Sequence, residues 1–360
     1  MTEPPRHDHA ARRTRLAERL DAVGLDALVV TGLPNLRYLT GFTGSAGRLL
    51  ARADGHHLFV TDGRYRDQVA AEVADLPRRI TRTDAWLDDV VGDAERIGLE
   101  AHLVPWATAR SLEQRLAPAE VVPAEPLVEH LRARKDEAEI DALERACAIT
   151  ARTWEALLDW IEPGVTERAV AQWAERTMVE LGADGSAFTP TVASGPNGAR
   201  PHHKDGRRTL ASGDLITVDM GARVDGYCAD MTRLVALGDP GGELRAVVDA
   251  VADAQQAAVA AVASGVAARD VDAAARDRLT EAGYGEAFVH GTGHGVGLEL
   301  HEAPRLGTTS DATLAARMAV TVEPGAYLPD VGGARIEDLV VVTHDGCRVL
   351  TTPDRALAVR

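Results

Sequence analysis

Hydrophobic positions in the last two thirds of the chain recur at helical spacing. Between Ile140 and Ile161 apolar residues return every three or four positions, which predicts a long helix that Pro163 and Gly164 bring to an end. Three more helices are predicted at about 166–181, 244–263 and 270–282. The segments between them have the pattern of strands, so the predicted order is two helices, strands, two helices and strands.

The first third of the chain has a different pattern. Short apolar runs at 26–31 and 57–61 alternate with helical stretches, which predicts a small α/β domain. A segment with three prolines, 117–126, then interrupts the pattern and marks a boundary. A chain of 360 residues is long for one domain, and we therefore predict two domains, 1–128 and 129–360.

The two predicted helix pairs belong to an internal repeat. Gly164 recurs as Gly265, and the segment 215–221 (LITVDMG) is similar to 319–325 (AVTVEPG), so the offset stays near 100 residues. That spacing is too long for a solenoid and only two copies exist. We therefore expect a packed domain with an internal pseudo-two-fold axis.

Each copy of the repeat carries two acids. Asp219 in the first copy corresponds to Glu323 in the second, and each is followed by a further acid, Asp230 or Glu337. Four carboxylates that converge in a protein interior cannot all stay charged unless cations lie among them. The repeat therefore predicts a metal site.

The first two acids are expected to share one face of a hairpin. Asp225 and Gly226 are a strong signal for a two-residue turn, and pairing outward from that turn sets Asp219 opposite Thr232. Asp230 then lies diagonal to Asp219, about 7 to 8 Å away at the backbone, where two carboxylates can hold one ion. An isolated pair of this kind more often consists of ordinary turn or edge acids, so the rest of the sequence must decide.

Three histidines lie between the two pairs of acids, in the glycine-rich segment 290–301. Glycines let the backbone approach an ion or a substrate closely, and they leave little bulk to bury an imidazole ring. His290, His294 and His301 are therefore candidates for metal binding or acid/base work rather than for the core.

The candidate ligands are four carboxylates and one imidazole, which is more than the three protein ligands of a catalytic zinc site. They suit two divalent ions about 3.5 to 4 Å apart, and Mn²⁺, Co²⁺, Fe²⁺ and Zn²⁺ are all chemically suitable. Such a pair of ions activates a water and polarises a carbonyl. The expected reaction is hydrolysis.

The composition limits the partners and the compartment. A net charge of -16 argues against nucleic acid or an anionic membrane as the partner, because phosphate binding needs clustered Lys and Arg. Three cysteines without paired spacing support neither a disulfide framework nor a zinc ribbon, and no apolar stretch nears the roughly 20 residues that span a bilayer. We expect a cytoplasmic protein.

The sequence also lacks the usual glycine motifs of dinucleotide and phosphate binding and the motifs His-Glu-x-x-His and Gly-x-Ser-x-Gly.

Through the four acids and His294, the chain resembles the pita-bread metallopeptidases, which include methionine aminopeptidase, prolidase and Xaa-Pro aminopeptidase. The segments 192–203 and 291–302 are similar to the prolidase and Xaa-Pro aminopeptidase branch of that family. The first domain resembles the creatinase-type N-terminal domain through 35–44 and 59–66. The resemblance implies an α/β (α+β) fold, with a creatinase-like N-terminal domain and a pita-bread catalytic domain that has an internal pseudo-two-fold repeat.

The resemblance also implies a role for each of the five candidate ligands. Asp219 would bind one metal ion, and His294 and Glu323 would bind the other. Asp230 and Glu337 would bridge the two ions, and Glu323 would also shuttle the proton. Two divalent ions are thus implied as cofactors, with Mn²⁺ as the first choice and Co²⁺, Zn²⁺ or Fe²⁺ as alternatives.

Further residues match family positions around the substrate. His202, His290 and His301 correspond to its outer histidines, with His202 and His301 near the scissile carbonyl or the departing proline. Arg335 corresponds to a supporting arginine. For His203, a functional role and a place as a solvated neighbour of His202 are equally open.

The function expected from the resemblance is that of an Xaa-Pro aminopeptidase, a metal-dependent exopeptidase that acts on peptides with proline in second position. An Xaa-Pro dipeptidase is the alternative, because the sequence does not show whether the pocket beyond the proline is closed. The complete set of ligand positions argues against a creatine amidinohydrolase and against a non-catalytic binding protein of the same fold. The resemblance also leads us to expect a homodimer.

Overall fold

The computed structural model describes residues 5–83, 87, 92–204, 206–352 and 354–360. The described chain forms two compact units, one of Arg6–Arg132 and one that contains Ala133–Arg360. The domain boundary that we propose at residue 128 falls within the short helix α5 (Leu127–Arg132).

The described part of the first unit is built on a six-stranded sheet with the strand order β4-β3-β2-β1-β5-β6. Its strands are β1 (Ala27–Val30), β2 (Arg48–Arg52), β3 (Leu58–Thr61), β4 (Arg78–Ile80), β5 (Arg96–Glu100) and β6 (Glu120–Ala124). Its other helices are α1 (His9–Ala22), α2 (Leu33–Thr40), η1 (Gly63–Tyr65), α3 (Arg66–Glu72) and α4 (Trp106–Leu116). Strands β1 and β3 are buried at every position, as their apolar runs predict, and the prediction of an α/β domain is confirmed.

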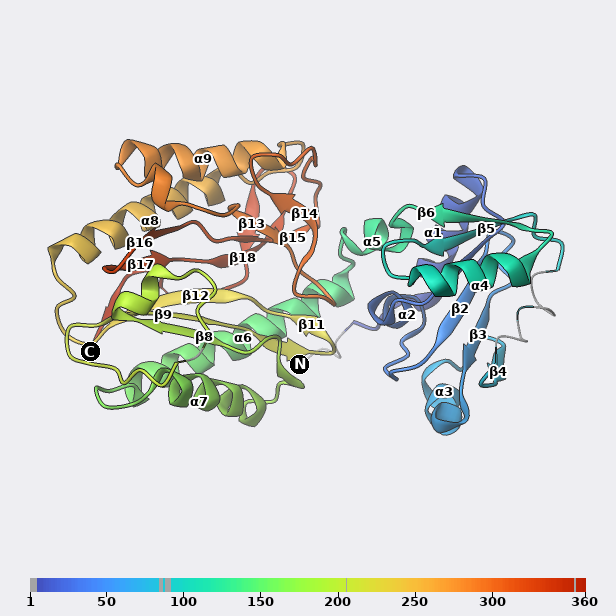
Figure 1. Cartoon of the computed structure of the whole chain (residues 1–360), viewed down its shortest axis with the longest axis horizontal. Coiled ribbons are helices and arrows are strands. Elements are labelled where there is room, and N and C mark those ends of the chain that lie inside the picture. The colour runs from blue at the N-terminus through green and yellow to red at the C-terminus, as the bar shows by residue number, and fades with distance from the viewer. Residues whose placement is uncertain (1–4, 84–86, 88–91, 205, 353) are drawn as a thin grey trace. The chain divides into compact units, whose positions relative to one another are not determined.

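The second unit contains the two predicted helix pairs. They are α6 (Glu137–Trp160) with α7 (Glu167–Glu180), and α8 (Gly242–Ala261) with α9 (Ala268–Glu281). Figure 1 shows one pair on each side of the strands. The buried apolar residues of α8 and α9 pack on β15 and β18, and those of α6 and α7 pack on β9 and β12. The first part of α6 also packs on strands of the second half, where it contacts Ala319 of β15 and Leu339 and Val341 of β18.

The strands of the second unit lie between the helix pairs. In the part of the unit that the structure describes, one sheet has the order β20-β12-β9-β8, another has the order β14-β13-β15-β18-β19, and two smaller sheets are β11-β10-β7 and β16-β17. The first half supplies β7 (Gly185–Ser186), β8 (Thr191–Ser194), η3 (Gly195–Ala199), β9 (Leu215–Met220), β10 (Ala222–Val224), β11 (Tyr227–Cys228) and β12 (Met231–Ala236). The second half supplies η4 (Gly285–Ala287), β13 (Gly293–Gly295), β14 (Glu302–Leu306), β15 (Ala319–Val322), β16 (Gly325–Leu328), β17 (Gly332–Arg335), β18 (Asp338–Val342), β19 (Cys347–Val349) and β20 (Ala358–Val359).

The long helix α6 follows the sequence pattern closely. It begins at a capping box, in which the Asp136 side chain accepts from the Glu139 backbone N–H at 3.0 Å and Glu139 accepts from the Asp136 N–H at 2.9 Å. The residues at the predicted spacing, among them Leu143 and Leu157, are fully buried. Of the helices in the described residues, none is both long enough and apolar enough to cross a membrane.

The hairpin that carries the first two acids has the predicted turn and register. Asp225 and Gly226 have φ values of 49° and 78°, which a type I′ turn requires at both central positions. Strands β9 and β12 pair antiparallel with Asp219 opposite Thr232, which confirms the prediction. The turn residues therefore place Asp219 and Asp230 at the same end of the hairpin.

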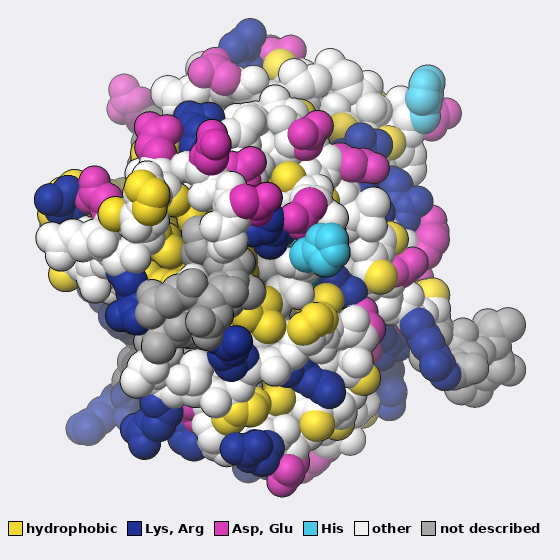
Figure 2. Space-filling model, turned by 90° about the vertical axis from the view of Figure 1, so that its right-hand side faces the viewer, with side chains coloured by type: hydrophobic (Ala, Val, Ile, Leu, Met, Phe, Trp, Pro, Cys, Tyr) yellow, Lys and Arg dark blue, Asp and Glu magenta, His cyan; other side chains and the backbone are white. Residues whose placement is uncertain are grey.

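Charged side chains of both signs cover the face of the molecule in Figure 2. Acidic side chains gather toward the top of that view, basic ones lie mainly toward the bottom, and hydrophobic side chains are scattered between them. The two signs of charge are thus unevenly distributed over the face shown.

The close approach of two strands at Gly221 generates a stability prediction. A Cβ atom at Gly221 would lie 1.8 Å from the Ala229 carbonyl oxygen, and a backbone atom cannot move aside as the end of a flexible side chain can. We expect Gly221→Ala to lower the free energy of unfolding by about 2 kcal/mol or more. Gly185→Ala is the matched control, because no atom lies within 4 Å of its Cβ position. Equal denaturation midpoints for the two variants would contradict the prediction.

Candidate metal centre

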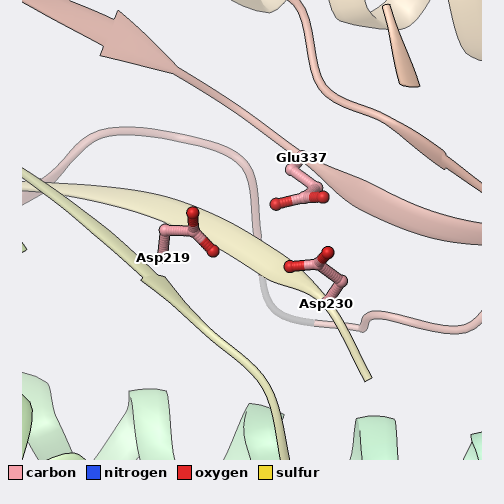
Figure 3. A group of neighbouring side chains, drawn as sticks. All are labelled: Asp219, Asp230 and Glu337. Atoms are coloured by element: carbon pink, nitrogen blue, oxygen red, sulfur yellow. The ribbon is translucent and has the colours of Figure 1, made fainter. Parts of the chain in front are cut away.

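Three carboxylates converge from separate strands of the second unit. Asp219 lies on β9, Asp230 directly precedes β12, and Glu337 lies between β17 and β18. One oxygen from each side chain can be chosen so that all three lie within 4.8 Å of one another, and Figure 3 shows the three carboxylates pointing toward a common centre. The acids of the two repeats therefore meet in one place.

A histidine and a fourth carboxylate extend this cluster. His294 lies on β13 and Glu323 directly follows β15. His294 Nε2 is 3.2 Å from Glu323 Oε1 and 3.7 Å from Asp230 Oδ2. The structure thus brings the five predicted metal ligands together.

Burial and mutual repulsion control the charge of the convergent acids. Burial, followed by the negative charges of Glu337 and Asp219, raises the pKa of Asp230 well above its ordinary value. Burial, with Glu323 and Asp219, does the same to the pKa of Glu337. Burial also raises the pKa of Asp219, although the positive charge of Arg335 partly opposes it. These acids can all be ionised only when cations lie among them.

Glu323 differs from the other acids because it has an imidazole partner. Burial alone would raise the pKa of Glu323, but the hydrogen bond and charge of His294 lower it to about 2. The same bond raises the pKa of His294 against the opposing effect of burial. Glu323 is therefore a carboxylate at neutral pH and can accept a proton.

Two features show that the cluster fits divalent metal ions. Asp219 Oδ1 is buried without a hydrogen-bond partner among the described residues, and such an oxygen is costly unless something positive approaches it. His294 Nδ1 lies 3.0 Å from the Gly295 carbonyl, and donation to that oxygen leaves Nε2 available as a ligand. Carboxylate oxygens with one imidazole nitrogen are a donor set that first-row divalent ions accept.

Arg335 holds several members of the cluster at once. Its Nη2 donates to Asp219 Oδ2 at 2.6 Å, and its Nε donates to the Thr232 hydroxyl at 3.2 Å. Thr232 in turn donates to Glu337 Oε2 at 2.7 Å. Sequence reasoning proposed a supporting role for Arg335 but assigned none to Thr232, although the predicted register already set Thr232 opposite Asp219.

Tyr327 is a further residue that sequence reasoning missed. Its buried hydroxyl lies 2.8 Å from His290 Nε2 and accepts from Arg335 Nη1 at 3.1 Å. It lies on β16, which begins two residues after the candidate ligand Glu323. Nothing in the spacing of apolar residues distinguishes this tyrosine from a core aromatic, so only the folded chain identifies it.

The other predicted histidines lie around the cluster. The His301 ring centroid is 4.3 Å from that of His294, and His301 is exposed. Burial lowers the pKa of both His290 and His301, and a nearby His202 contributes to the lowering in each case. His202 is exposed, whereas His203 is buried and faces away from solvent, so it is no solvated neighbour.

Arg305 was not singled out from the sequence, yet it lies beside the cluster. Strands β13 and β14 pair antiparallel with Arg305 directly opposite His294, and residues opposite each other in such a pair share one face of the sheet. Arg305 is exposed and is close enough to His301 to help lower its pKa. The site therefore has a cation at its open edge.

Two family models match the chain. Residues 141–344 match the model of metallopeptidase family M24, and residues 12–134 match the model of the creatinase/prolidase N-terminal domain. These matches confirm the pita-bread fold expected for the second domain and the creatinase-like fold expected for the first.

Known proteins are similar to the chain over nearly its whole length. The Xaa-Pro dipeptidase of Pyrococcus horikoshii is 33% identical over 345 residues, which are 95% of this chain and 97% of that protein. The structure of an Xaa-Pro dipeptidase from Bacillus anthracis has a TM-score of 0.93 and 37% identity, and the match covers 98% of this chain and 100% of the other. The structure of an X-Pro aminopeptidase from Thermotoga maritima has a TM-score of 0.88 and 35% identity. That match covers 96% of this chain and 99% of the other.

The repulsion within the cluster generates a prediction for metal removal. We expect chelation to lower the melting temperature of the second unit and Mn²⁺ to restore it, because ligand binding stabilises only the folded state. Asp230→Asn replaces an acid whose burial among other carboxylates is unfavourable in either protonation state, so it should raise the metal-free melting temperature by about 2 °C or more and abolish the gain from Mn²⁺. Asp249→Asn, at an exposed position of α8, is the matched control. A normal gain from Mn²⁺ in Asp230→Asn would refute the assignment.

Proposed function

Because the chain belongs to metallopeptidase family M24, we propose that it is an Xaa-Pro dipeptidase, a metallo-exopeptidase that hydrolyses the bond between a first residue and a following proline. The observation that carries the proposal is the single cluster formed by the five ligand positions. The Xaa-Pro aminopeptidase expected first from the sequence becomes the second candidate. Two features support this order: the cation at the edge of the site and the names of similar proteins, two of which are Xaa-Pro dipeptidases.

In this proposal the cluster holds two divalent metal ions. By the family resemblance, Asp219 would hold one ion, His294 and Glu323 would hold the other, and Asp230 and Glu337 would serve both. When bound, the ions supply a water acidic enough to attack at neutral pH and polarise the scissile carbonyl. Mn²⁺ is the proposed metal, since carboxylate-rich sites suit it.

Glu323 moves the proton of the reaction. Glu323 is ionised at neutral pH, and in this proposal it accepts the proton that the attacking water gives up. It then passes that proton to the proline nitrogen as the bond between the carbonyl carbon and that nitrogen breaks. A free first residue and a free proline result.

The outer histidines bind and orient the substrate. The lowered pKa values of His290 and His301 favour neutral rings at pH 7. His301 can then donate one N–H to a substrate oxygen. His290 has both ring nitrogens engaged, since Nδ1 donates to the Gly291 carbonyl and Nε2 accepts from the Tyr327 hydroxyl. The hydroxyl of Tyr327 fixes the ring of His290 at 2.8 Å. His202 completes the group, and its effect on the pKa of both other histidines supports a place near them.

Arg305 gives the proposal its preference for dipeptides. In an Xaa-Pro dipeptide a carboxylate follows the proline ring directly, whereas a longer peptide has an uncharged amide there. An arginine beside His294 and His301 can pair with that carboxylate through charge-assisted hydrogen bonds. The binding energy of this pair would therefore be available to dipeptides alone.

The Xaa-Pro aminopeptidase is kept as the second candidate for a specific reason. His202, His301 and Arg305 are all exposed in the second unit, so that unit by itself leaves the departing side of the substrate open. The X-Pro aminopeptidase among the similar structures supports the same alternative.

A homodimer is a further part of the proposal and rests on the family resemblance. Residence in the cytoplasm is proposed from three free cysteines.

The proposal is tested with metal-stripped protein reloaded with Mn²⁺. We expect release of alanine from the dipeptide Ala-Pro, with kcat/KM at least about 100-fold above that for Ala-Ala, since specificity built on shape and hydrogen bonds reaches that size. The tripeptide Ala-Pro-Ala should be cleaved much more slowly than Ala-Pro. Efficient cleavage of the tripeptide would favour the aminopeptidase, and no metal-dependent cleavage of either would refute both candidates.

The role of Arg305 has its own test. Arg305→Ala should raise KM for Ala-Pro by about 10- to 100-fold, because a charge-assisted hydrogen bond contributes about 1.5 to 3 kcal/mol. Activity on Ala-Pro amide, which has no carboxylate, should change little. Arg245→Ala serves as the control, because Arg245 is an exposed residue of α8 that pairs with Asp239. Equal losses on the acid and the amide would show that Arg305 does not read the carboxylate.

A further inference from the structure

Each half of the second unit has a buried acid on its second helix, and that acid holds the loop that carries histidines of the site. Glu167 lies at the start of α7 and Asp272 lies within α9, and neither residue has measurable exposure. A buried carboxylate is costly unless donors surround it. In both halves the histidine loop supplies some of these donors, and in the second half Arg276 of α9 supplies the others.

Glu167 binds three residues of the loop that follows β8. Its Oε1 accepts from the Ser194 backbone N–H at 2.8 Å and from the Ser194 hydroxyl at 2.7 Å. Asn197 donates to Oε1 and Oε2 at 2.9 and 3.1 Å, and His203 Nε2 donates to Oε2 at 2.9 Å. Burial alone would raise the pKa of Glu167, but the bonds from Asn197 and Ser194 lower it. One carboxylate thus ties residue 194 to residue 203.

Asp272 has the corresponding place in the second half. Its Oδ1 accepts from the backbone N–H and from the hydroxyl of Thr292, both at 2.9 Å. Thr292 lies between His290 and His294, and its carbonyl accepts from the Glu323 N–H at 2.7 Å. Each half therefore has a buried acid that accepts from the backbone N–H and from the hydroxyl of one Ser or Thr. In the first half the acid binds two further residues of the loop, Asn197 and His203.

His202 lies between two anchored neighbours. On one side the Pro201 carbonyl accepts from Arg335 Nη1 at 3.3 Å, and Arg335 is bonded to Asp219. On the other side the buried His203 is bonded to Glu167. The backbone on both sides of His202 is therefore fixed, whereas the His202 ring itself is exposed.

We propose that Glu167 and His203 are positioning residues that hold His202 against the metal cluster. The inference rests on the proposed function, because His202 matters only if a substrate binds there. His203 does not touch the substrate in this account. It acts through His202, by fixing the loop that projects the His202 ring toward His290 and His301.

The first test is a double-mutant cycle on Ala-Pro hydrolysis by the Mn²⁺-loaded protein. His203→Ala should lower kcat by about 10- to 100-fold, as is usual for residues that orient a catalytic group. His203→Gln keeps a donor for Glu167 and should restore most of the rate. His344→Ala, at an exposed position, is the control for loss of a histidine.

The cycle separates positioning from general loss of structure. If His203 acts through His202, the variant His202→Ala/His203→Ala should be no more than about 2-fold slower than His202→Ala alone. Rate losses that multiply would overturn the proposal. Wild-type activity in His203→Ala would overturn it as well.

The second test does not depend on activity. In zinc-loaded protein labelled with ¹³C at histidine Cε1, the His202 signal is identified by its absence in His202→Ala. It should be a single sharp line in the wild type and should shift and broaden in His203→Ala, while the His294 signal stays in place. An unchanged His202 signal would refute the positioning role even if the protein cleaves Xaa-Pro bonds. A changed signal in a protein without activity would uphold the positioning and refute the proposed function alone.

Discussion

The repulsion between carboxylates buried together is the constraint on which the second unit depends. Asp219, Asp230 and Glu337 bring their oxygens within 4.8 Å, and burial raises the pKa of each of them. No hydrophobic packing around these side chains can remove that cost. Divalent cations can offset this electrostatic cost. Among the described residues, Asp219 Oδ1 is buried without a hydrogen-bond partner, so a cation would stabilise this oxygen most directly.

The duplicated architecture follows from the same constraint. One half contributes the hairpin with Asp219 and Asp230, and the other contributes His294, Glu323 and Glu337. The helices pack on the strands through apolar residues, whereas the polar groups of the site lie at or next to strand ends. Apolar residues stabilise the fold, and a different set of residues carries the charges of the site. The fold can therefore tolerate the unfavourable burial of these charges.

Hydrogen bonds from neighbouring groups give the acids of the centre different roles. The imidazole of His294 keeps Glu323 ionised, while Arg335 and Thr232 orient Asp219 and Glu337. The loops that carry His202 and His290 are hydrogen-bonded to buried acids of the helices, Glu167 and Asp272. The chemistry of the site therefore depends on residues that lie well outside its ligands.

The sequence by itself predicted the elements from local spacing, and it predicted the five candidate ligands from an internal repeat and a family resemblance. The stripe of α6, the turn at Asp225 and the register that sets Asp219 opposite Thr232 all follow from short-range rules. Arg305, Tyr327 and the pair of Glu167 with His203 became visible only in the folded chain. Glu167 and His203 are 36 residues apart, and Tyr327 and His290 are 37 apart. No local pattern links residues at such separations, since tertiary packing alone decides which side chains meet.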